Sequence, residues 1–408
     1  MEHEWKTLKG QLKQSVLAGI DFSRENSEEE LWEKIDEQIV LKAKECAITV
    51  EQRIKLRREL FSSLRQLDLL QELVDDPSIT EIMVNGVQNI FIEQKGRICQ
   101  WDSHFDSEQT LQDVIQQIVA RCNRVVNEAS PIVDARLENG SRVNIVLNPI
   151  ALNGPILTIR RFPDQPVSME QLIAFGSLTE EVSEFLCKLV KSRYNILVSG
   201  GTGSGKTTFL NVLSNFIPTE ERIITIEDSA ELQIRNVPNL VSLETRNANV
   251  EGCREITIRE LIRASLRMRP DRVIVGEVRG GEAIDMLQAM NTGHDGSMST
   301  GHANSAQDML NRLETMVLMG MELPLAAIRK QIASGIDIIV QLGRLRDKTR
   351  KVLQIMEVTG VEQGEILLSP LYLFEEKGEE DGRIVGTLQK KGELFHREKM
   401  ESAGIRMG

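Results

Sequence analysis

The chain has 408 residues, and this length predicts about two or three domains rather than one small core. Its formal net charge is −12, from 49 basic and 61 acidic side chains, which argues against a dedicated DNA- or RNA-binding protein. The five cysteines form no CxxC pair and therefore indicate reduced cytosolic thiols rather than a disulfide framework or a zinc site. Neither an apolar signal region nor an apolar run of roughly 18 residues is present, so we expect any membrane association to be peripheral.

Residues 1–70 predict an N-terminal helical region, which is polar up to about residue 27. Apolar residues recur every four positions at Leu31, Ile35 and Ile39, and basic side chains interleave with apolar ones in "RIKLRREL". This basic pattern is typical of a solvated face on a small helical bundle. The alternative is a docking surface for a partner or for an acidic membrane.

Residues 71–162 predict a compact α+β domain. Short β-like runs follow the helix-breaking "DDPSI", and a helix with one apolar face covers about 108–126. Two more β-like runs, "SRVNIVL" and "PILTIRRF", end this domain. Residues 163–192, which begin with "PDQPVS", indicate a linker and a connecting helix.

Residues 193–375 alternate between β-like and helical segments, which predicts a parallel sheet with crossover helices. A tail rich in Gly and Glu, 376–408, follows this domain. The predicted fold class is therefore α/β, with a parallel-sheet domain preceded by a small α+β domain and an N-terminal helical region.

The stretch "SGGTGSGKTT" fits the phosphate-binding pattern G-x-x-x-x-G-K-[ST]. It follows the β-like "NILVS" and opens a helix, which is the context that this pattern requires. Backbone N–H groups in such a loop point at phosphate oxygens, a lysine reaches the β- and γ-phosphates of ATP, and a Thr hydroxyl is a ligand of Mg²⁺. We therefore expect Lys206 on the phosphates and Thr207 on Mg²⁺. The predicted nucleotide-binding residues are Gly201, Thr202, Gly203, Ser204, Gly205, Lys206, Thr207 and Thr208.

Two apolar strands end in carboxylates that can complete such a site. "RVIVGEVRG" ends in Glu277, where an ATPase with this loop places an acid beside Mg²⁺, and Gly276 stands where many such sites carry Asp. As the single acid there, Glu277 is expected to act on Mg²⁺ through water or, alternatively, on the attacking water. "ITIEDSAEL" ends in three acids, one of which is expected to orient the attacking water: Glu227, Asp228 and Glu231.

The segment "TGHDGSMSTGHANS" contains His294 and His302. A histidine at the end of a sheet strand beside the phosphate loop can sense the γ-phosphate or bridge subunits, and the alternative for each is a side chain with no role in the site. A metal pair is disfavoured because no third ligand is evident.

Together, "GGTGSGKTT", "TIEDSAEL" and "LRMRPDRVIVGEVRGGEAIDMLQAMNTGHDGSMSTGHANS" resemble in order and spacing the secretion ATPase superfamily that powers type II secretion, type IV pili and type IV secretion. "SLETRNANVEG" and "RLETMVLMGMELPLAAIRKQIASGIDIIVQ" are similar to the CpaF/TadA ATPases of Tad (Flp) pilus systems. The resemblance implies a RecA-like motor domain, with ATP held between this domain and the α+β domain that precedes it.

The resemblance also assigns roles to residues by their position in these motifs. It implies that Glu231 is the catalytic acid, that Glu277 is the Walker B acid, and that His302 acts with them in catalysis. His294 is the other histidine of the His box and is placed with the nucleotide-binding residues. Ser229 stands where many members carry Pro, and the CpaF-like branch often lacks that Pro.

Two arginines of the α+β domain are implied to reach the phosphates. They are Arg142 in "GSRVNIV" and Arg160 in "TIRRFP", with Arg161 as the alternative to Arg160. A guanidinium can stabilise the charge of the phosphoryl-transfer transition state, which agrees with this role.

The implied function is that of a homo-hexamer on the cytoplasmic face of the inner membrane. It would hydrolyse ATP to assemble, or also retract, a Tad- or type IV-like pilus or to secrete a substrate, and it would act on pilins indirectly through inner-membrane platform proteins. The alternative is a conjugation-type (type IV secretion) ATPase or a RecA-like nucleic-acid motor. The net charge and the N-terminal helices favour the pilus motor, so no direct contact with nucleic acid is expected. A non-hydrolysing ATP-dependent switch is disfavoured by the placed carboxylates and arginines.

Overall fold

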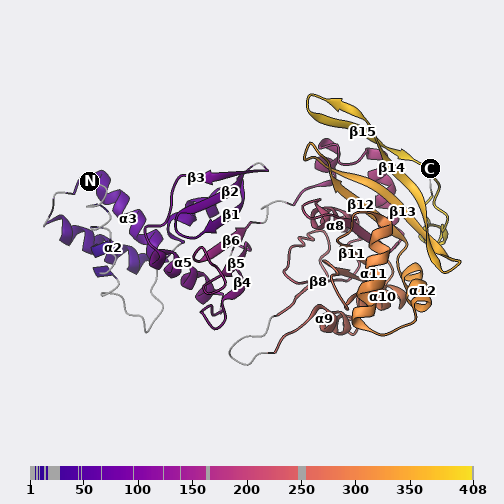
Figure 1. Cartoon of the computed structure of the whole chain (residues 1–408), viewed down its shortest axis with the longest axis horizontal. Helices are drawn as coiled ribbons and strands as arrows, with labels where there is room; N and C mark the ends of the chain where they lie inside the picture. Colours follow the sequence, from indigo (N-terminus) through magenta and orange to yellow (C-terminus); the bar gives the residue numbers. More distant parts are fainter. Residues whose placement is uncertain are drawn as a thin grey trace. The chain divides into compact units, whose positions relative to one another are not determined.

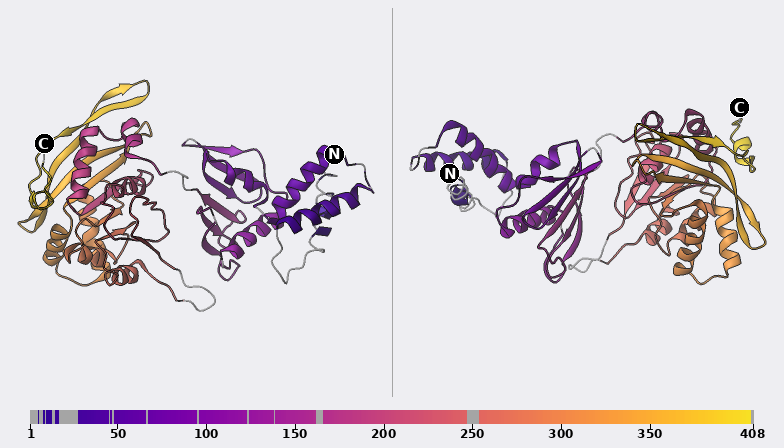
Figure 2. Two further views of the ribbon diagram at one scale, coloured as in Figure 1. Left: turned by 180° about the vertical axis from the view of Figure 1, so that it is seen from behind. Right: turned by 45° about the horizontal axis from the view of Figure 1, so that its top comes forward.

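The fold is taken from a computed structural model, which describes residues 5, 8, 10–12, 15–16, 28–44, 46, 48–65, 67–94, 96–122, 124–137, 139–161, 166–246 and 254–406. The chain forms two compact units, Met1–Asp164 and Gln165–Gly408 (Figures 1 and 2). Residues 163–165 of the predicted linker and the preceding residue 162 lie outside the described residues. The four described cysteines are free thiols, and Cys253 lies outside the described residues.

The first unit contains two helices ahead of its sheet, α2 (Glu28–Ala43) and α3 (Val50–Arg65). Their apolar faces form a small core of their own, in which Ile35, Leu56 and Leu60 are fully buried. The four-residue repeats in the sequence predicted this pair, because residues at that spacing share one face of a helix. Two short helices then lead into the sheet, η1 (Asp68–Leu70) and α4 (Gln71–Asp75).

The rest of the first unit is an antiparallel six-stranded sheet in the order β3-β2-β1-β6-β5-β4. Helix α5 (Glu108–Arg121), whose N-terminus is capped by the Ser107 hydroxyl, buries Leu111, Ile115 and Ile118 against one face of this sheet. Alternate strand residues point to the other face, which α5 does not cover. The strands are β1 (Ile79–Asn85), β2 (Asn89–Gln94), β3 (Arg97–Trp101), β4 (Ile132–Arg136), β5 (Arg142–Val146) and β6 (Ile156–Arg160).

A nine-stranded sheet organises the second unit, in the order β15-β14-β13-β12-β7-β11-β10-β8-β9. The strands from β12 to β9 in this order run parallel to one another, and β13, β14 and β15 each run antiparallel to their neighbours. The strands are β7 (Ile196–Gly200), β8 (Ile223–Glu227), β9 (Leu240–Glu244), β10 (Arg272–Val275), β11 (Met298–Gly301), β12 (Ile338–Arg344), β13 (Arg350–Glu362), β14 (Glu365–Glu380) and β15 (Arg383–Lys390).

Helices cover both faces of this sheet, which accounts for its almost continuously apolar parallel strands. In β7, Ile196 and Val198 pack into one core with α7 and α8, while Leu197 packs into the other core with α10, α11 and α12 (Figure 1). The helices are α6 (Met169–Ala174), α7 (Glu180–Lys191), α8 (Lys206–Ser214), α9 (Ile258–Ser265), α10 (Ala283–Asn291), α11 (Ala306–Gly320), α12 (Leu325–Gly335) and α13 (Glu398–Ser402).

The second unit extends beyond the boundaries that the sequence suggested. The predicted boundary between residues 375 and 376 falls inside β14, and the sheet continues to the end of β15. Helix α7, assigned to a connecting segment, buries Leu186 and Leu189 in the same core as β7. The final segment contributes Leu394 and Met400 to that core. The prediction of a separate connecting helix and a separate tail is therefore corrected: both belong to the second unit, because both bury apolar side chains in its core.

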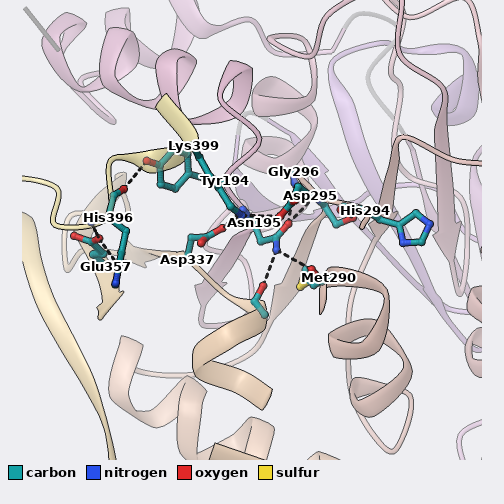
Figure 3. Close-up of polar contacts among 12 residues, drawn as sticks. Tyr194, Asn195, Met290, His294, Asp295, Gly296, Asp337, Glu357, His396 and Lys399 are labelled. Carbon is teal, nitrogen blue, oxygen red and sulfur yellow. Dashed lines mark hydrogen bonds and ion pairs between the residues drawn. The ribbon is translucent and has the colours of Figure 1, made fainter. Parts of the chain in front are cut away.

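The C-terminal segment is also fixed by polar contacts (Figure 3). The Tyr194 hydroxyl donates to the His396 carbonyl oxygen at 2.6 Å. The buried Glu357 carboxylate accepts from the backbone N–H groups of Phe395 and His396 at 2.7 and 2.8 Å.

Across the described residues, the structure contains no helix with the length and apolar character of a membrane span.

Candidate active site

The phosphate-binding stretch forms the loop between β7 and α8. Gly203 and Gly205 have φ angles of +72° and +91°, in the left-handed region that favours glycine, so the loop needs both glycines at these positions. Gly205 is the N-cap of α8, and Lys206 is its first residue, with only 7% of its surface exposed. The loop therefore places a lysine at the positive end of a helix, as an anion site requires.

Among the described residues, two groups contact the Lys206 ammonium, and neither is a carboxylate. Its Nζ donates to the Gly201 carbonyl oxygen at 3.1 Å and lies 3.2 Å from Nδ1 of His302. Burial lowers the pKa of Lys206, the Glu277 charge opposes this shift, and the Arg279 charge adds to it. The hydroxyl of Ser204, in the same loop, is buried without a hydrogen-bond partner among the described residues. The loop thus presents a partly desolvated cation and an unsatisfied hydroxyl, which fits a phosphate chain.

His302 links Lys206 to Glu277. It follows β11, and its Nε2 lies 2.9 Å from Oε1 of Glu277. An ammonium can only donate, so Nδ1 of His302 accepts from Lys206 and the ring proton sits on Nε2, the ring nitrogen nearer to Glu277. Burial, followed by the charge of Lys206, lowers the pKa of His302, while Glu277 opposes the shift. His302 is therefore a neutral bridge between a cation and an anion.

Arg279 completes this group of side chains, and the sequence analysis did not include it. Its guanidinium contacts Oε2 of Glu277 at 2.9 Å and Oδ2 of Asp228 at 3.2 Å. The contact with Glu277 is the main cause that raises the pKa of Arg279. Arg279 thus joins the acids at the ends of β8 and β10. Its position two residues after Glu277 in "GEVRG" was the signal available in the sequence.

The three acids at the end of β8 have different surroundings. Glu227 is buried, and its Oε1 accepts from the backbone N–H groups of Glu231 and Leu232 at 2.8 and 3.0 Å. Its side chain also occupies the space beside Gly276, where an added Cβ would lie 2.8 Å from Cγ of Glu227. A side chain at position 276 would therefore collide with Glu227 unless one of the two moved. Glu231 is half-buried, and Asp228 is exposed and paired with Arg279.

His294 lies at the opposite edge of the sheet. It precedes β11, whereas His302 follows it, and β11 runs parallel to β7, which leads into the phosphate loop. A strand of this length spans about 13 Å. The Nδ1 of His294 is 3.1 Å from the Ala289 carbonyl oxygen, and its ring points away from Asn195 in Figure 3. His294 therefore does not lie beside the phosphate loop of its own chain, and its placement with the nucleotide-binding residues stays a prediction, as does a role between subunits.

The arginines predicted to reach the phosphates lie in the first unit. Arg142 and Arg160 are direct partners across β5 and β6, so their side chains share the sheet face that α5 leaves open. Arg160 also pairs in register with Glu81 of β1, and its charge opposes the burial that raises the pKa of Glu81. The Arg161 guanidinium instead donates to the carbonyl oxygen of Asp76. As the candidate for a phosphate contact, Arg160 is thus favoured over Arg161, because the Arg161 guanidinium is already bonded within the first unit.

Comparisons with known proteins agree with this geometry. A family model described as type II/IV secretion system protein matches residues 63–381. Conjugal transfer protein TrbB of Rhizobium radiobacter is 33% identical over 310 residues, which cover 75% of this chain and 91% of that protein. Type IV secretion system protein VirB11 of Brucella suis is 32% identical over 307 residues, which cover 68% and 84%. The solved structure of the pilus retraction motor PilT with bound ADP has a TM-score of 0.51 at 19% identity, covering 83% of this chain and 87% of PilT.

The parallel sheet with its phosphate loop and the likeness to PilT confirm the predicted α/β, RecA-like secretion ATPase fold. The chain belongs to the type II/IV secretion system protein family. This confirms the superfamily that the motifs resembled. The closer similarity to the CpaF/TadA branch stays a prediction, because TrbB and VirB11 belong by name to conjugation and type IV secretion.

Proposed function

We propose that this protein binds ATP with Mg²⁺ at the loop between β7 and α8 and hydrolyses it to drive a secretion or pilus machine. The observation that carries the proposal is the series of contacts from Lys206 through His302 to Glu277. These contacts place the Lys206 ammonium, which has no carboxylate partner among the described residues, near Glu277, the acid that follows β10. A phosphate chain needs the cation, and its bound metal needs the acid.

The phosphates would be held by Lys206 and by backbone N–H groups between residues 201 and 208. Mg²⁺ would be held by the Thr207 hydroxyl and by Glu277, and when bound it would neutralise charge on the β- and γ-phosphates. Within the part of the chain that the structure describes, no group of three or more His, Cys, Asp or Glu side chains could hold a metal ion. This fits Mg²⁺, which takes one or two protein ligands and otherwise keeps water and phosphate oxygens.

Glu231 is the proposed general base for the attacking water. Glu227 is unsuited to this role because its carboxylate already accepts two backbone hydrogen bonds in a buried position. His302 would keep its proton on Nε2 and thereby hold Glu277 in place. Arg142 and Arg160 are proposed to stabilise the transition state from the α+β domain.

The proposed test compares ATP hydrolysis by the purified protein with that of Lys206→Ala. This change should abolish hydrolysis and weaken ATP binding, because the loop loses its point charge on the phosphates. Lys330→Ala, which removes an exposed lysine of the same unit, is the control and should hydrolyse ATP normally. Wild-type turnover by Lys206→Ala would refute the site.

We further propose that the protein acts as a homo-hexamer at the inner face of the cytoplasmic membrane, on the platform protein of a Tad-like pilus. The motifs similar to the CpaF/TadA branch support this role, and the relatives TrbB and VirB11 support the alternative of a conjugation-type ATPase. Crosslinking in cells followed by mass spectrometry separates the two. A multi-span membrane protein and pilins would support the pilus motor, and a DNA-processing partner would support the alternative.

A further inference from the structure

An arginine outside the predicted site contacts the phosphate loop. Arg350 begins β13, and its Nε–H donates to the Gly203 carbonyl oxygen at 2.9 Å. Its side chain also lies beside Gly205, where an added Cβ would be 3.6 Å from Cδ of Arg350. The two ends of this contact are 147 positions apart in the chain. The antiparallel extension of the sheet is therefore what brings the arginine to the loop.

The contact is made at a glycine whose backbone conformation is left-handed. Gly203 is one of the two loop glycines with a left-handed backbone, and because glycine populates positive and negative φ about equally, contacts from outside the loop help to decide which conformation is held. A charged donor on the Gly203 carbonyl fixes the peptide plane that follows this residue. Because hydrogen bonds to charged groups are stronger than neutral ones, Arg350 favours one arrangement of the loop over others.

The backbone around Arg350 is tied to the segment by which the chain enters the second unit. The Ser177 hydroxyl donates to the Arg350 carbonyl oxygen at 2.9 Å, and the Val352 N–H donates to the Ser177 carbonyl oxygen at 2.9 Å. The Lys351 ammonium donates to the Gly176 carbonyl oxygen at 3.0 Å. Gly176 and Ser177 lie between α6 and α7, soon after the residues that join the two units. A continuous series of contacts thus runs from this entry segment to the phosphate loop.

We propose that Arg350 is a positioning residue for the nucleotide, which holds the phosphate loop in its binding form and couples it to the entry segment at Ser177. This inference rests on the proposed ATPase function. Without Arg350, binding of the phosphates would itself have to order the loop, so loss of Arg350 would weaken ATP binding. Once ATP is bound, the loop is held by the phosphates, and the chemical step proceeds at its usual rate.

The first test is Arg350→Ala, assayed by ATP hydrolysis over a range of ATP concentrations. The KM for ATP should rise about 5- to 10-fold, the effect of losing one hydrogen bond, while kcat stays within about twofold. Arg350→Lys, which keeps a charged donor, should recover part of the loss. Thermal unfolding without nucleotide should not change, because Arg350 is exposed. Arg346→Ala is the control, since this arginine of the same hairpin pairs with Glu376 and should leave KM unchanged.

The second test is a double-mutant cycle with Ser177→Ala. This change should raise KM about two- to threefold in the wild-type background and have no effect in Arg350→Ala, because both act through one series of contacts. Additive effects would refute the coupling. An unchanged KM in Arg350→Ala would refute the positioning role, and a fall in kcat alone would mean that Arg350 instead contacts the transition state. Failure of the proposed function is distinct, because the wild-type protein itself would then show no hydrolysis above Lys206→Ala.

Discussion

The two edges of the parallel sheet in the second unit carry the same kinds of side chain in opposite arrangements. At the edge where β7 ends, the Lys206 ammonium contacts a carbonyl oxygen and the neutral ring of His302. At the edge where β7 begins, the Lys399 ammonium contacts two carboxylates, Asp295 at 2.8 Å and Asp337 at 2.7 Å (Figure 3). Lys206 is therefore not paired with a carboxylate among the described residues, whereas Lys399 is paired with two.

The amide of Asn195 is fully paired at the edge where β7 begins. Its Oδ1 accepts from the N–H groups of Gly296 and Ser297, and its Nδ2 donates to the carbonyl oxygens of Met290 and Gly335. Such pairing is typical of a structural network. An unpaired hydroxyl by itself does not distinguish the two edges, because the Ser204 hydroxyl in the phosphate loop and the Ser192 hydroxyl before β7 are both buried without a partner among the described residues. The contrast lies in the partners of the two lysines.

The largest effect on this contrast is expected from Glu231→Gln. It should lower kcat by at least about 100-fold, the usual contribution of a positioned general base, while ATP binding and oligomerisation persist. Hydrolysis and ATP binding of the purified variant measure both. Glu227→Gln is the matched comparison and should lower thermal stability first, because it weakens the acceptor of two buried backbone N–H groups. An inactive Glu227→Gln beside an active Glu231→Gln would reverse the assignment.

At the opposite edge, Glu357→Ala should lower the free energy of unfolding by about 2 to 3 kcal/mol, since it leaves the N–H groups of Phe395 and His396 without their acceptor. Denaturant unfolding of the whole chain measures this change. Turnover per folded molecule should stay normal, because this edge takes no part in the proposed chemistry. Glu393→Ala, in the same segment but exposed, is the control and should change neither. Loss of turnover without loss of stability in Glu357→Ala would contradict a purely structural edge.

The smallest effect is a pH dependence that comes from His302. Its pKa is lowered in the folded protein, so the unfolded chain binds the proton more readily. The folded protein should therefore lose stability as the pH falls below the ordinary histidine pKa of about 6.5. His302→Gln keeps a donor toward Glu277 without a titrating group and should lose less stability between about pH 7 and pH 5. Equal losses in both proteins, measured by thermal unfolding, would show that His302 does not remain neutral.

Much of the site could be predicted because its parts are local. The phosphate loop needs glycines at particular turns and a lysine at the start of a helix, and all of these lie within one short stretch. The acids Glu227 and Glu277 could be placed because each ends an apolar strand, and parallel strands in one sheet end at one edge. The helical pair before residue 70 followed from its four-residue repeats in the same way.

Other features depended on packing between distant segments. The sequence places His294 and His302 in one motif, but β11 separates them and carries them to opposite edges of the sheet. The amino-acid sequence alone determined the phosphate loop, the alternation of strands and helices, and the acids at strand ends, because these depend on neighbours along the chain. Only the tertiary structure decided that Glu227 fills the space beside Gly276, that the C-terminal segment closes the motor core, and that Arg350 reaches Gly203. Those contacts join residues far apart in the chain, and strand order and register, which no local pattern encodes, bring them together.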